Sequence, residues 1–519
     1  MKKSAIVIGS GFSGLSAACF LAKAGWQVKL VEKNATPGGR ARQFSESGFT
    51  FDMGPSWYWM PDVFERFFNQ FNKKVADYYE LERLDPSYKI FWQDDETDIP
   101  AEFEELKKLF NSLEENSAEK LEQFLQEAAY KYKVGINKLV HKPGLSITEF
   151  ADADLIKGVF KLDVFTNMSK HVSKYFTNPK LKQLLEFPVL FLGALPKNIP
   201  ALYSLMNYAD LVGGTWYPQK GMYSIVNGMY KLAKELGVEF CFDEEVLKIN
   251  VENGKAIEVI SQKSKTKSEE QVNIEQGILN DEVLFTTLNP KQQTYKADVI
   301  IASSDYHHTE TKLLESKYQS YTKKYWDTRI LAPSCLLYYV GLNKKLKNIL
   351  HHNLFFDTNF DLHGKEIYDT KVYPTDPMFY LCAPSLTDET VAPKGQENLF
   401  FLIPIASGLE NDTETLRKKY FDIVVERLEN RIGESVKDSI IYYKSYATSN
   451  FIEDYHSFKG NAYGLANTLL QTSILKPSCR SKKVKNLFYT GQLTVPGPGI
   501  PPSLISGEVV AGLVNTLFK

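Results

Sequence analysis

The strongest constraint on the fold lies in the first fifty residues, where a glycine-rich turn separates a strand pattern from a helix pattern. Residues 5–8 are an apolar run that predicts a buried parallel strand, and Gly9, Gly11 and Gly14 follow in the spacing GxGxxG. Gly9 permits the tight turn, Gly11 lets backbone approach a pyrophosphate, and Gly14 lets the helix pack on the strand. In this strand–turn–helix context the motif predicts a dinucleotide-binding site.

The residues after this turn complete the expected site. Phe12 and Ser13 open the helix, whose N-terminal N–H groups and dipole favour phosphate. Residues 28–31 predict a second parallel strand, and Glu32 at its end can accept hydrogen bonds from ribose hydroxyls. We therefore predict Phe12, Ser13, Glu32 and the adjacent Lys33 as cofactor contacts, together with the three glycines.

A second glycine motif bears on which dinucleotide is bound. Residues 38–40 read Gly-Gly-Arg, in which the glycine pair permits close backbone contact and the arginine suits a phosphate oxygen. Asp52 follows shortly after, at the end of an aromatic strand pattern. With this run the chain resembles the superfamily of FAD-containing amine oxidases and carotenoid desaturases, whose fingerprint continues from the strand-end acid to GGR and D-x-G. The resemblance implies FAD contacts at Gly39, Arg40, Gly54, Pro55 and Ser56.

The C-terminal residues carry another part of this resemblance. Residues 486–491 predict a buried strand that ends at Gly491, and the proline-rich loop of residues 496–502 precedes a helix pattern. Proline is favourable at a helix start, and the helix N-terminus can stabilise negative charge on a reduced flavin. In carotenoid desaturases a PGxGIP-like loop lies over the isoalloxazine, which implies contacts from Gly491, Gly499 and Ile500.

A third match lies in the middle of the chain, where residues 221–250 predict a helix and two strands. In the family this stretch brings backbone near Val246 to the adenine, and the apolar strand of residues 296–305 returns to the flavin domain. The resemblance implies an α/β fold with a Rossmann-like FAD-binding domain that is discontinuous in sequence. The expected division is FAD-binding domain at 1–75, 216–310 and 480–519, mixed or antiparallel substrate domain at 76–115 and 311–479, and helical, membrane-docking insertion at 116–215.

Length and composition agree with a packed protein of several domains. The chain has 519 residues, enough for two or three domains of about 100–200 residues each. Its net charge of −2 gives no basis for nucleic-acid binding, which requires a strongly basic patch. The five cysteines show no CxxC or metal spacing, which indicates a reduced, cytoplasmic chain. Adjacent histidines such as His351 and His352 are expected to point apart as solvated loop residues, so no metal site is predicted.

The sequence predicts contact with a membrane surface rather than a membrane span. The first apolar stretch is the Rossmann strand rather than a signal peptide, and no window holds the ~18 apolar residues of a span. Residues 155–182 hold six lysines against one acid, with apolar residues at gaps of three or four. This pattern predicts a basic helix whose apolar stripe either docks at the inner face of an anionic membrane or packs on the protein's own core.

Aromatic residues lie around the expected flavin site. Trp57, Tyr58 and Trp59 directly follow Ser56, and Trp216 precedes the mid-chain match. Aromatic faces bury much apolar area and suit a long apolar substrate, although each would equally suit core packing. We predict these four residues as substrate contacts.

The resemblance implies a carotenoid desaturase of the phytoene dehydrogenase type as the leading function. Such an enzyme introduces double bonds into a C40 polyene, such as phytoene or a later carotene, by hydride transfer to flavin N5. Oxygen or a quinone is the expected electron acceptor, because the chain has one dinucleotide fingerprint. The alternative is a carotene isomerase that keeps FAD without net redox change, followed by a flavin amine oxidase.

The catalytic residues stay open at this stage. Some desaturases of this family carry an acid and an arginine in a helical segment whose nearest match here is residues 124–129. Gln126 and Ala129 stand at those places, so no catalytic residue is assigned. Residues 101–142 predict a solvated amphipathic helix pair, and residues 261–295 a long polar excursion without an assigned function.

Overall fold

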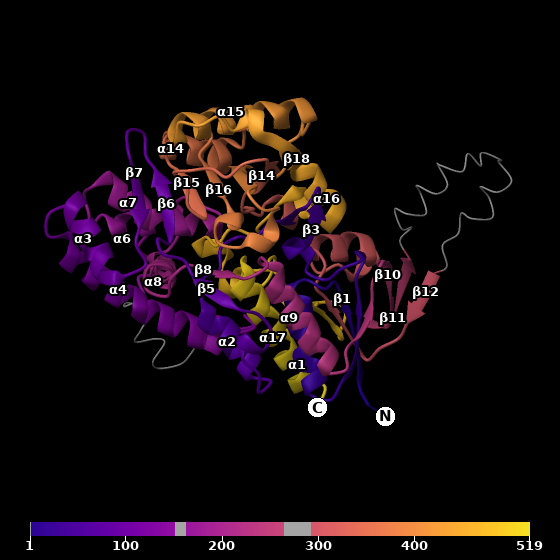
Figure 1. Cartoon of the computed structure of the whole chain (residues 1–519). Coiled ribbons are helices and arrows are strands. Elements are labelled where there is room, and N and C mark those ends of the chain that lie inside the picture. The colour runs from indigo at the N-terminus through magenta and orange to yellow at the C-terminus, as the bar shows by residue number, and fades with distance from the viewer. Residues whose placement is uncertain (1, 151–161, 264–291) are drawn as a thin grey trace, which may run out of the picture.

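The computed structural model describes residues 2–150, 162–263 and 292–519. Figure 1 shows an α/β region near both termini, an antiparallel sheet region covered by α15, and a helical region beside them. Segments far apart in sequence meet in the α/β region, because its strands come from the beginning, the middle and the end of the chain. This arrangement confirms the predicted α/β fold with a Rossmann-like, sequence-discontinuous region.

The parallel sheet forms around β1. In the described residues it has five strands in the order β19-β13-β1-β2-β9. Ile6 of β1 pairs with Lys29 on one side and with Ile300 on the other. The strands are short and mostly buried, as the apolar runs predicted. Their bounds are β1 (Ser4–Ile8), β2 (Gln27–Val31), β9 (Glu239–Cys241), β13 (Val299–Ala302) and β19 (Leu487–Tyr489).

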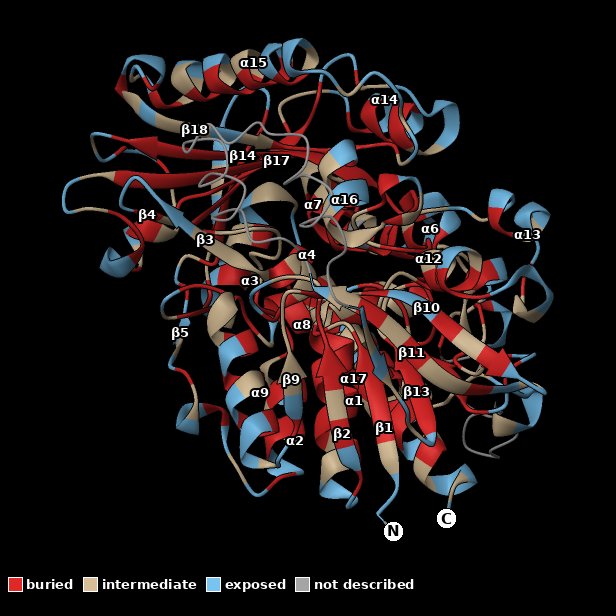
Figure 2. Ribbon diagram, turned by 90° about the vertical axis from the view of Figure 1, so that its right-hand side faces the viewer, coloured by how far each residue is buried: buried red, intermediate tan, exposed pale blue. Residues whose placement is uncertain are grey.

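Alternate residues of β1 face two different layers. Ala5 and Val7 pack in one core with helices α1, α9 and α17, whereas Ile6 and Ile8 pack in another with the sheet β10-β11-β12. Figure 2 shows the buried strands β1, β2 and β13 in the interior of this region. The elements of the two layers are α1 (Phe12–Lys23), α9 (Tyr223–Glu235), α17 (Ile500–Leu517), β10 (Glu244–Glu252), β11 (Lys255–Lys263) and β12 (Gln292–Tyr295).

The second large sheet is antiparallel except where β15 pairs with β6. Within the described parts of the chain its order is β18-β14-β17-β16-β15-β6-β7. Helix α15 (Glu414–Ile432) covers one face through Phe421, Val424 and Leu428, and the opposite face looks toward the α/β region. The strands are β6 (Tyr88–Phe91), β7 (Glu96–Ile99), β14 (Ser334–Leu342), β15 (His352–Phe355), β16 (Phe379–Cys382), β17 (Glu397–Ile405) and β18 (Ile440–Tyr446).

The helical region contains α3 (Phe103–Leu113) and α4 (Ser117–Val134), which form the predicted amphipathic pair. The single basic helix predicted over 155–182 is wrong for its described part. Two short helices, α6 (Met168–Val172) and α7 (Pro179–Glu186), replace it, and the amide side chains of Asn167 and Asn178 cap their N-termini. The apolar residues of the stripe from Met168 to Phe176 are buried in the protein's own core. Lys157 and Lys161 lie outside the described residues, as does most of the 261–295 excursion.

Smaller elements join these regions. Two-stranded ribbons pair β3 (Gln43–Glu46) with β4 (Phe49–Asp52) and β5 (Leu81–Arg83) with β8 (Trp216–Pro218). In the described parts of the chain, no helix combines the length and apolar character that crossing a bilayer requires. The remaining α-helices are α2 (Pro61–Asn69), α8 (Leu205–Leu211), α12 (Tyr306–His308), α13 (Lys323–Asp327), α14 (Phe360–Gly364) and α16 (Thr448–Tyr455).

Candidate functional site

The glycine-rich turn joins β1 to α1, and its glycines serve two purposes: some allow close packing, and one leaves open space. Gly9 has a φ of +96°, and its amide donates to the Val31 carbonyl at 2.8 Å. A Cβ on Gly14 would overlap the Gly9 carbonyl oxygen, whereas a Cβ on Gly11 would meet no atom within 4 Å. Gly14 is therefore needed for helix packing. Gly11 leaves open space at the N-terminus of α1, where an anion is favoured.

Glu32 lies directly after β2 with its carboxylate buried beside the turn. Its Oε2 accepts from the Ser10 amide at 2.8 Å and the Ser10 hydroxyl at 2.7 Å, and its Oε1 accepts from the Asn34 amide at 2.9 Å. The Glu244 amide donates to the Glu32 carbonyl at 2.9 Å, so the strand that carries buried Val246 begins beside this acid. A ribose hydroxyl would share the carboxylate with these donors.

Other predicted contacts in this half of the site point in different directions. Phe12 is buried, and the Ser13 hydroxyl lies 2.8 Å from that of Ser303. Lys33 directs its Nζ to the Glu453 carbonyl in α16 at 2.8 Å. The structure thus brings Ser13 to the turn, while the Lys33 ammonium reaches away from it.

The Gly-Gly-Arg motif packs directly on the glycine-rich turn. Gly39 has a φ of +56°, and a Cβ there would lie 3.3 Å from the Gly11 Cα, so glycine favours this close approach. The Arg40 Nη2 donates to the Ser457 hydroxyl at 3.0 Å, while its buried Nε has no partner among the described residues. A buried guanidinium with a spare N–H suits an anion such as a dinucleotide pyrophosphate. Gly11, Gly39 and Arg40 therefore fit the phosphates of FAD.

The D-x-G motif ties this cradle to α9. Asp52 accepts from the amides of Met222 at 2.7 Å and Tyr223 at 3.1 Å, and so satisfies the N-terminus of that helix. Burial raises the pKa of the Asp52 carboxyl to about 6. A Cβ on Gly54 would lie 2.8 Å from the Arg40 carbonyl oxygen. Pro55 and Ser56 continue from there into a small cavity, which His351 and Cys382 also line.

The C-terminal loop lies against the same turn because α17 packs on α1. A Cβ on Gly507 would overlap the Ser13 carbonyl, and one on Gly491 would lie 3.3 Å from the Ser13 hydroxyl. Gly499 has a φ of +107° and is the N-cap of α17, which begins at Ile500. This packing brings Gly491 beside the turn and places Gly499 and Ile500 at the start of the helix that packs on α1.

An apolar cavity lies against the antiparallel sheet, lined in part by residues of β15, β16 and β17. The empty space between its walls is about 730 Å³, part of it open to solvent. His363 accepts at Nδ1 from the Met378 amide at 2.8 Å and donates from Nε2 to the Pro404 carbonyl at 3.1 Å. The Tyr368 hydroxyl donates to the Leu190 carbonyl at 3.1 Å. With these groups paired, the wall is set by Phe187, Leu190, Leu354, Phe356, Phe360, Ile367, Met378, Leu402 and Pro404.

The cavity ends next to the C-terminal loop. Pro333 and Tyr463 line it, and Gly464 follows directly, where a Cβ would lie 2.7 Å from the Gln492 carbonyl oxygen. Gln492 is the neighbour of Gly491, so the apolar wall and the predicted flavin loop are adjacent.

The four aromatic residues predicted as substrate contacts have different surroundings. Trp57 packs against Tyr380 and Phe187 of the cavity wall, with ring centroids 5.5 and 6.3 Å away. Tyr58 is buried and its hydroxyl lies 2.9 Å from that of Tyr79. Trp59 and Trp216 donate their indole N–H groups to Thr215 and Gly213. None of these four residues is among the described residues that line the apolar cavity. Trp57 packs directly behind the cavity wall.

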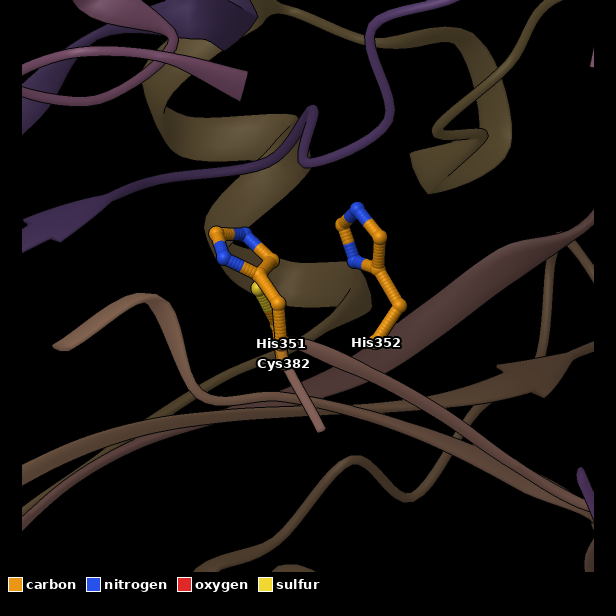
Figure 3. A group of neighbouring side chains, drawn as sticks. All are labelled: His351, His352 and Cys382. Atoms are coloured by element: carbon orange, nitrogen blue, oxygen red, sulfur yellow. The ribbon is translucent and has the colours of Figure 1, made fainter. Parts of the chain in front are cut away.

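The prediction that His351 and His352 are solvated and point apart is wrong. Both are buried, and Figure 3 shows their rings on the same side of the chain beside the Cys382 thiol. One nitrogen of each ring and the sulfur lie within 4.8 Å of one another. The alternation of a strand does not separate the rings, because His351 precedes β15 and His352 begins it.

This cluster supports the aromatic wall. The Nδ1 atom of His351 lies 2.8 Å from the Thr387 hydroxyl, and that of His352 lies 2.6 Å from the Tyr380 hydroxyl. Burial lowers the pKa values of both imidazoles and raises that of the Cys382 thiol to about 12, so all three are uncharged at neutral pH. The His352 ring stacks on Trp57 with centroids 4.2 Å apart. The cluster therefore holds Trp57 against Tyr380.

Sequence reasoning missed the residues that line the cavity. On β17 they recur with period two, as in Leu402 and Pro404, so alternation could have identified one face of that strand. It could not have shown that this face borders a cavity rather than a packed core.

Comparisons with known proteins agree with this geometry. The family described as flavin containing amine oxidoreductase matches residues 12–515. The chain is 40% identical to a carotenoid 3,4-desaturase of Haloarcula japonica, over 97% of this chain and 96% of that protein. It is 27% identical to a zeta-carotene-forming phytoene desaturase of Myxococcus xanthus, over 98% and 93%.

Solved structures show the same fold at lower identity. An oxidoreductase from Methanosarcina mazei superposes with a TM-score of 0.59 at 16% identity, over 99% of this chain and all of that one. A putrescine oxidase variant gives a TM-score of 0.62 at 10% identity, over 99% of both chains. The glycine turn, the Gly-Gly-Arg cradle and these full-length matches together establish that the chain belongs to the family of flavin-containing amine oxidoreductases, with FAD as its cofactor.

Proposed function

We propose that this protein is an FAD-dependent carotenoid desaturase, which introduces carbon–carbon double bonds into a long apolar polyene. The observation that carries the proposal is the apolar cavity beside the C-terminal loop, in which His363 and Tyr368 are already hydrogen-bonded within the protein. Such a wall offers no charged partner for an amine and selects by shape. The 40% identity to a carotenoid 3,4-desaturase over nearly the whole chain supports the same substrate class.

Different residues serve cofactor and substrate. Gly11, Gly39 and Arg40 would hold the pyrophosphate, Glu32 the adenosine ribose, and backbone near Val246 the adenine. Bound FAD supplies hydride acceptance at N5. The cavity side chains orient the polyene against the flavin loop and exclude water from the reacting carbons. Trp57, held by His352, keeps Tyr380 of the wall in place.

The finer assignments belong to the same proposal. The substrate is a C40 polyene such as phytoene or a later carotene, and oxygen or a quinone takes up the electrons. A single dinucleotide-binding turn supports this acceptor class, since a second nucleotide such as NADP would need its own site.

A peripheral position on a membrane also belongs to the proposal, because the substrate is insoluble in water. Two exposed apolar segments support it, 145–147 and 469–475, in which Ile147 is 71% and Leu470 77% exposed. They lie together, since a Cβ on Gly144 would be 3.3 Å from the Ser473 carbonyl oxygen. Exposed apolar side chains grouped in this way favour insertion at a lipid interface.

Flotation with liposomes tests the membrane contact. We expect the wild-type protein to float and the double variant Ile147→Glu/Leu470→Glu to stay in solution. Ile441→Glu on β18 is the matched control, because Ile441 is 51% exposed on a different element. Equal flotation of the double variant and the control would assign the contact to another surface.

Conversion of polyene tests the function itself. The FAD-loaded protein, given an acyclic C40 carotene in liposomes, should yield products that are lighter by two hydrogens per step and absorb at longer wavelength. Turnover should continue under argon when a quinone is added. A product of unchanged mass with altered double-bond geometry would instead identify an isomerase.

A further inference from the structure

A buried polar cluster beneath the 496–500 loop is not used by the site described above. Lys476 follows the turn Ser473–Leu475 and is only 4% exposed. Its Nζ has no hydrogen-bond partner among the described residues, and neither has Oδ1 of the buried Asn467 or Oγ1 of Thr468. A Cβ on Gly497 would lie 3.3 Å from the Lys476 Nζ and 3.0 Å from the Asn467 Oδ1, so both side chains reach the loop.

Lys476 differs from the other buried lysines of the described structure. Lys131 pairs with Asp163 at 2.9 Å, and Lys89 pairs with Glu96 at 2.6 Å. Lys476 has no such acid, and burial lowers the pKa of its amine to about 7. An unpaired buried amine costs stability, and such groups occur mainly where a ligand or a reaction uses them.

The position of the amine indicates which ligand it meets. The loop above it ends in Gly499, the N-cap of α17, and leads away from Gly491 beside the glycine-rich turn. The N-terminus of α17 and the protonated Lys476 amine therefore both place positive charge beside the 496–500 loop, which the family resemblance places over the isoalloxazine. A flavin ring that has accepted a hydride carries negative charge, which such groups stabilise.

We propose that Lys476, with Asn467 beside it, lies beneath the 496–500 loop and from there stabilises the negative charge of the reduced flavin ring on the other side of the loop. Lys476 neither donates nor accepts the hydride, and it acts across the loop by its charge alone. The inference rests on FAD binding and not on the identity of the polyene.

The two-electron midpoint potential of the bound FAD, measured on the holoprotein without substrate, tests the proposal. We expect Lys476→Met to weaken the preference for the reduced form at least about tenfold, which corresponds to a potential lower by about 30 mV. Lys476→Arg should restore most of the difference. Lys131→Met, which removes another buried lysine, should leave the potential unchanged. A wild-type potential in Lys476→Met would overturn the proposal.

A second variant keeps the test decisive if Lys476→Met does not retain FAD. Asn467→Leu removes the neighbouring unpaired amide, and we expect a smaller shift of the potential in the same direction. An unchanged potential in that holoprotein would then overturn the proposal. Because no polyene is present, a failure of desaturation in the conversion assay would leave this result untouched.

Discussion

The glycine-rich cradle that we propose for the cofactor and the apolar cavity that we propose for the substrate are built on opposite principles. The cradle consists of backbone, glycine and buried hydrogen bonds, as in the contact of Gly39 with Gly11 and the four donors around Glu32. The cavity is lined by apolar side chains such as Phe356 and Leu402, and the polar groups of His363 and Tyr368 are hydrogen-bonded within the protein. A pyrophosphate needs close backbone N–H groups, whereas a polyene offers only shape.

The comparison also holds within the glycine-rich turn. A Cβ on Gly14 would overlap protein atoms, whereas a Cβ on Gly11 would lie in open space. Glycine at position 14 is therefore required by the fold, and we expect that glycine at position 11 is required by the ligand.

The largest effect is expected from Gly14→Val. A side chain there would overlap the Gly9 carbonyl, so β1 and α1 could not pack, at a cost of about 3 kcal/mol or more. Denaturant unfolding followed by circular dichroism measures this, and Gly512→Val in α17, where a Cβ meets no atom within 4 Å, is the control. Wild-type stability in Gly14→Val would show that the turn relaxes.

Gly11→Val should separate binding from folding. A Cβ there meets no protein atom within 4 Å, yet the valine side chain would fill space in front of α1 that a pyrophosphate would enter. We expect a folded protein whose affinity for FAD falls about 100-fold or more, roughly 3 kcal/mol. Flavin fluorescence titration of the apoprotein gives the affinity, and unchanged binding would place the phosphates elsewhere.

Filling the cavity should spare the cofactor. Leu402→Trp places a large ring in the apolar space, so we expect polyene turnover to fall about tenfold or more while FAD affinity stays at the wild-type value. Leu402→Met keeps the volume and is the control. Equal turnover in Leu402→Trp and Leu402→Met would remove this cavity as the substrate site.

An effect on stability that depends on pH should appear at Asp210, a buried carboxyl with fewer donors than Glu32. Tyr88 donates to it at 2.8 Å, and burial raises its pKa to about 7. The folded protein therefore holds this proton where the unfolded chain has lost it, so Asp210 lowers stability as pH rises from about 4 to 7. We expect the unfolding free energy of Asp210→Asn to gain on that of the wild type over this range, by on the order of 2–4 kcal/mol. The difference between the two melting temperatures, measured across this pH range, should rise accordingly. A pH-independent difference would show that the carboxyl is ionised throughout.

The sequence predicted the arrangement of the glycine-rich motifs better than that of the helical region over residues 155–182. Residues of the turn, Glu32, the Gly-Gly-Arg motif and the C-terminal loop meet as expected, because positive φ and close approach demand glycine at fixed spacings. The basic helix over 155–182 was wrong because Asn167 and Asn178 start new helices, with Pro179 in the first turn of the second. Helical spacing in the sequence did not reveal these interruptions.

By itself the sequence determined the flavin-binding α/β region, since its local backbone requirements are written in residue types a few positions apart. Only the tertiary structure decided which apolar faces stay open. Leu354 and Leu402 come from different strands, β15 and β17, and nothing local distinguishes a wall from a core. The same holds for Lys476, which is one of many lysines in the sequence. Its buried, unpaired position arises only when the 496–500 loop folds over it.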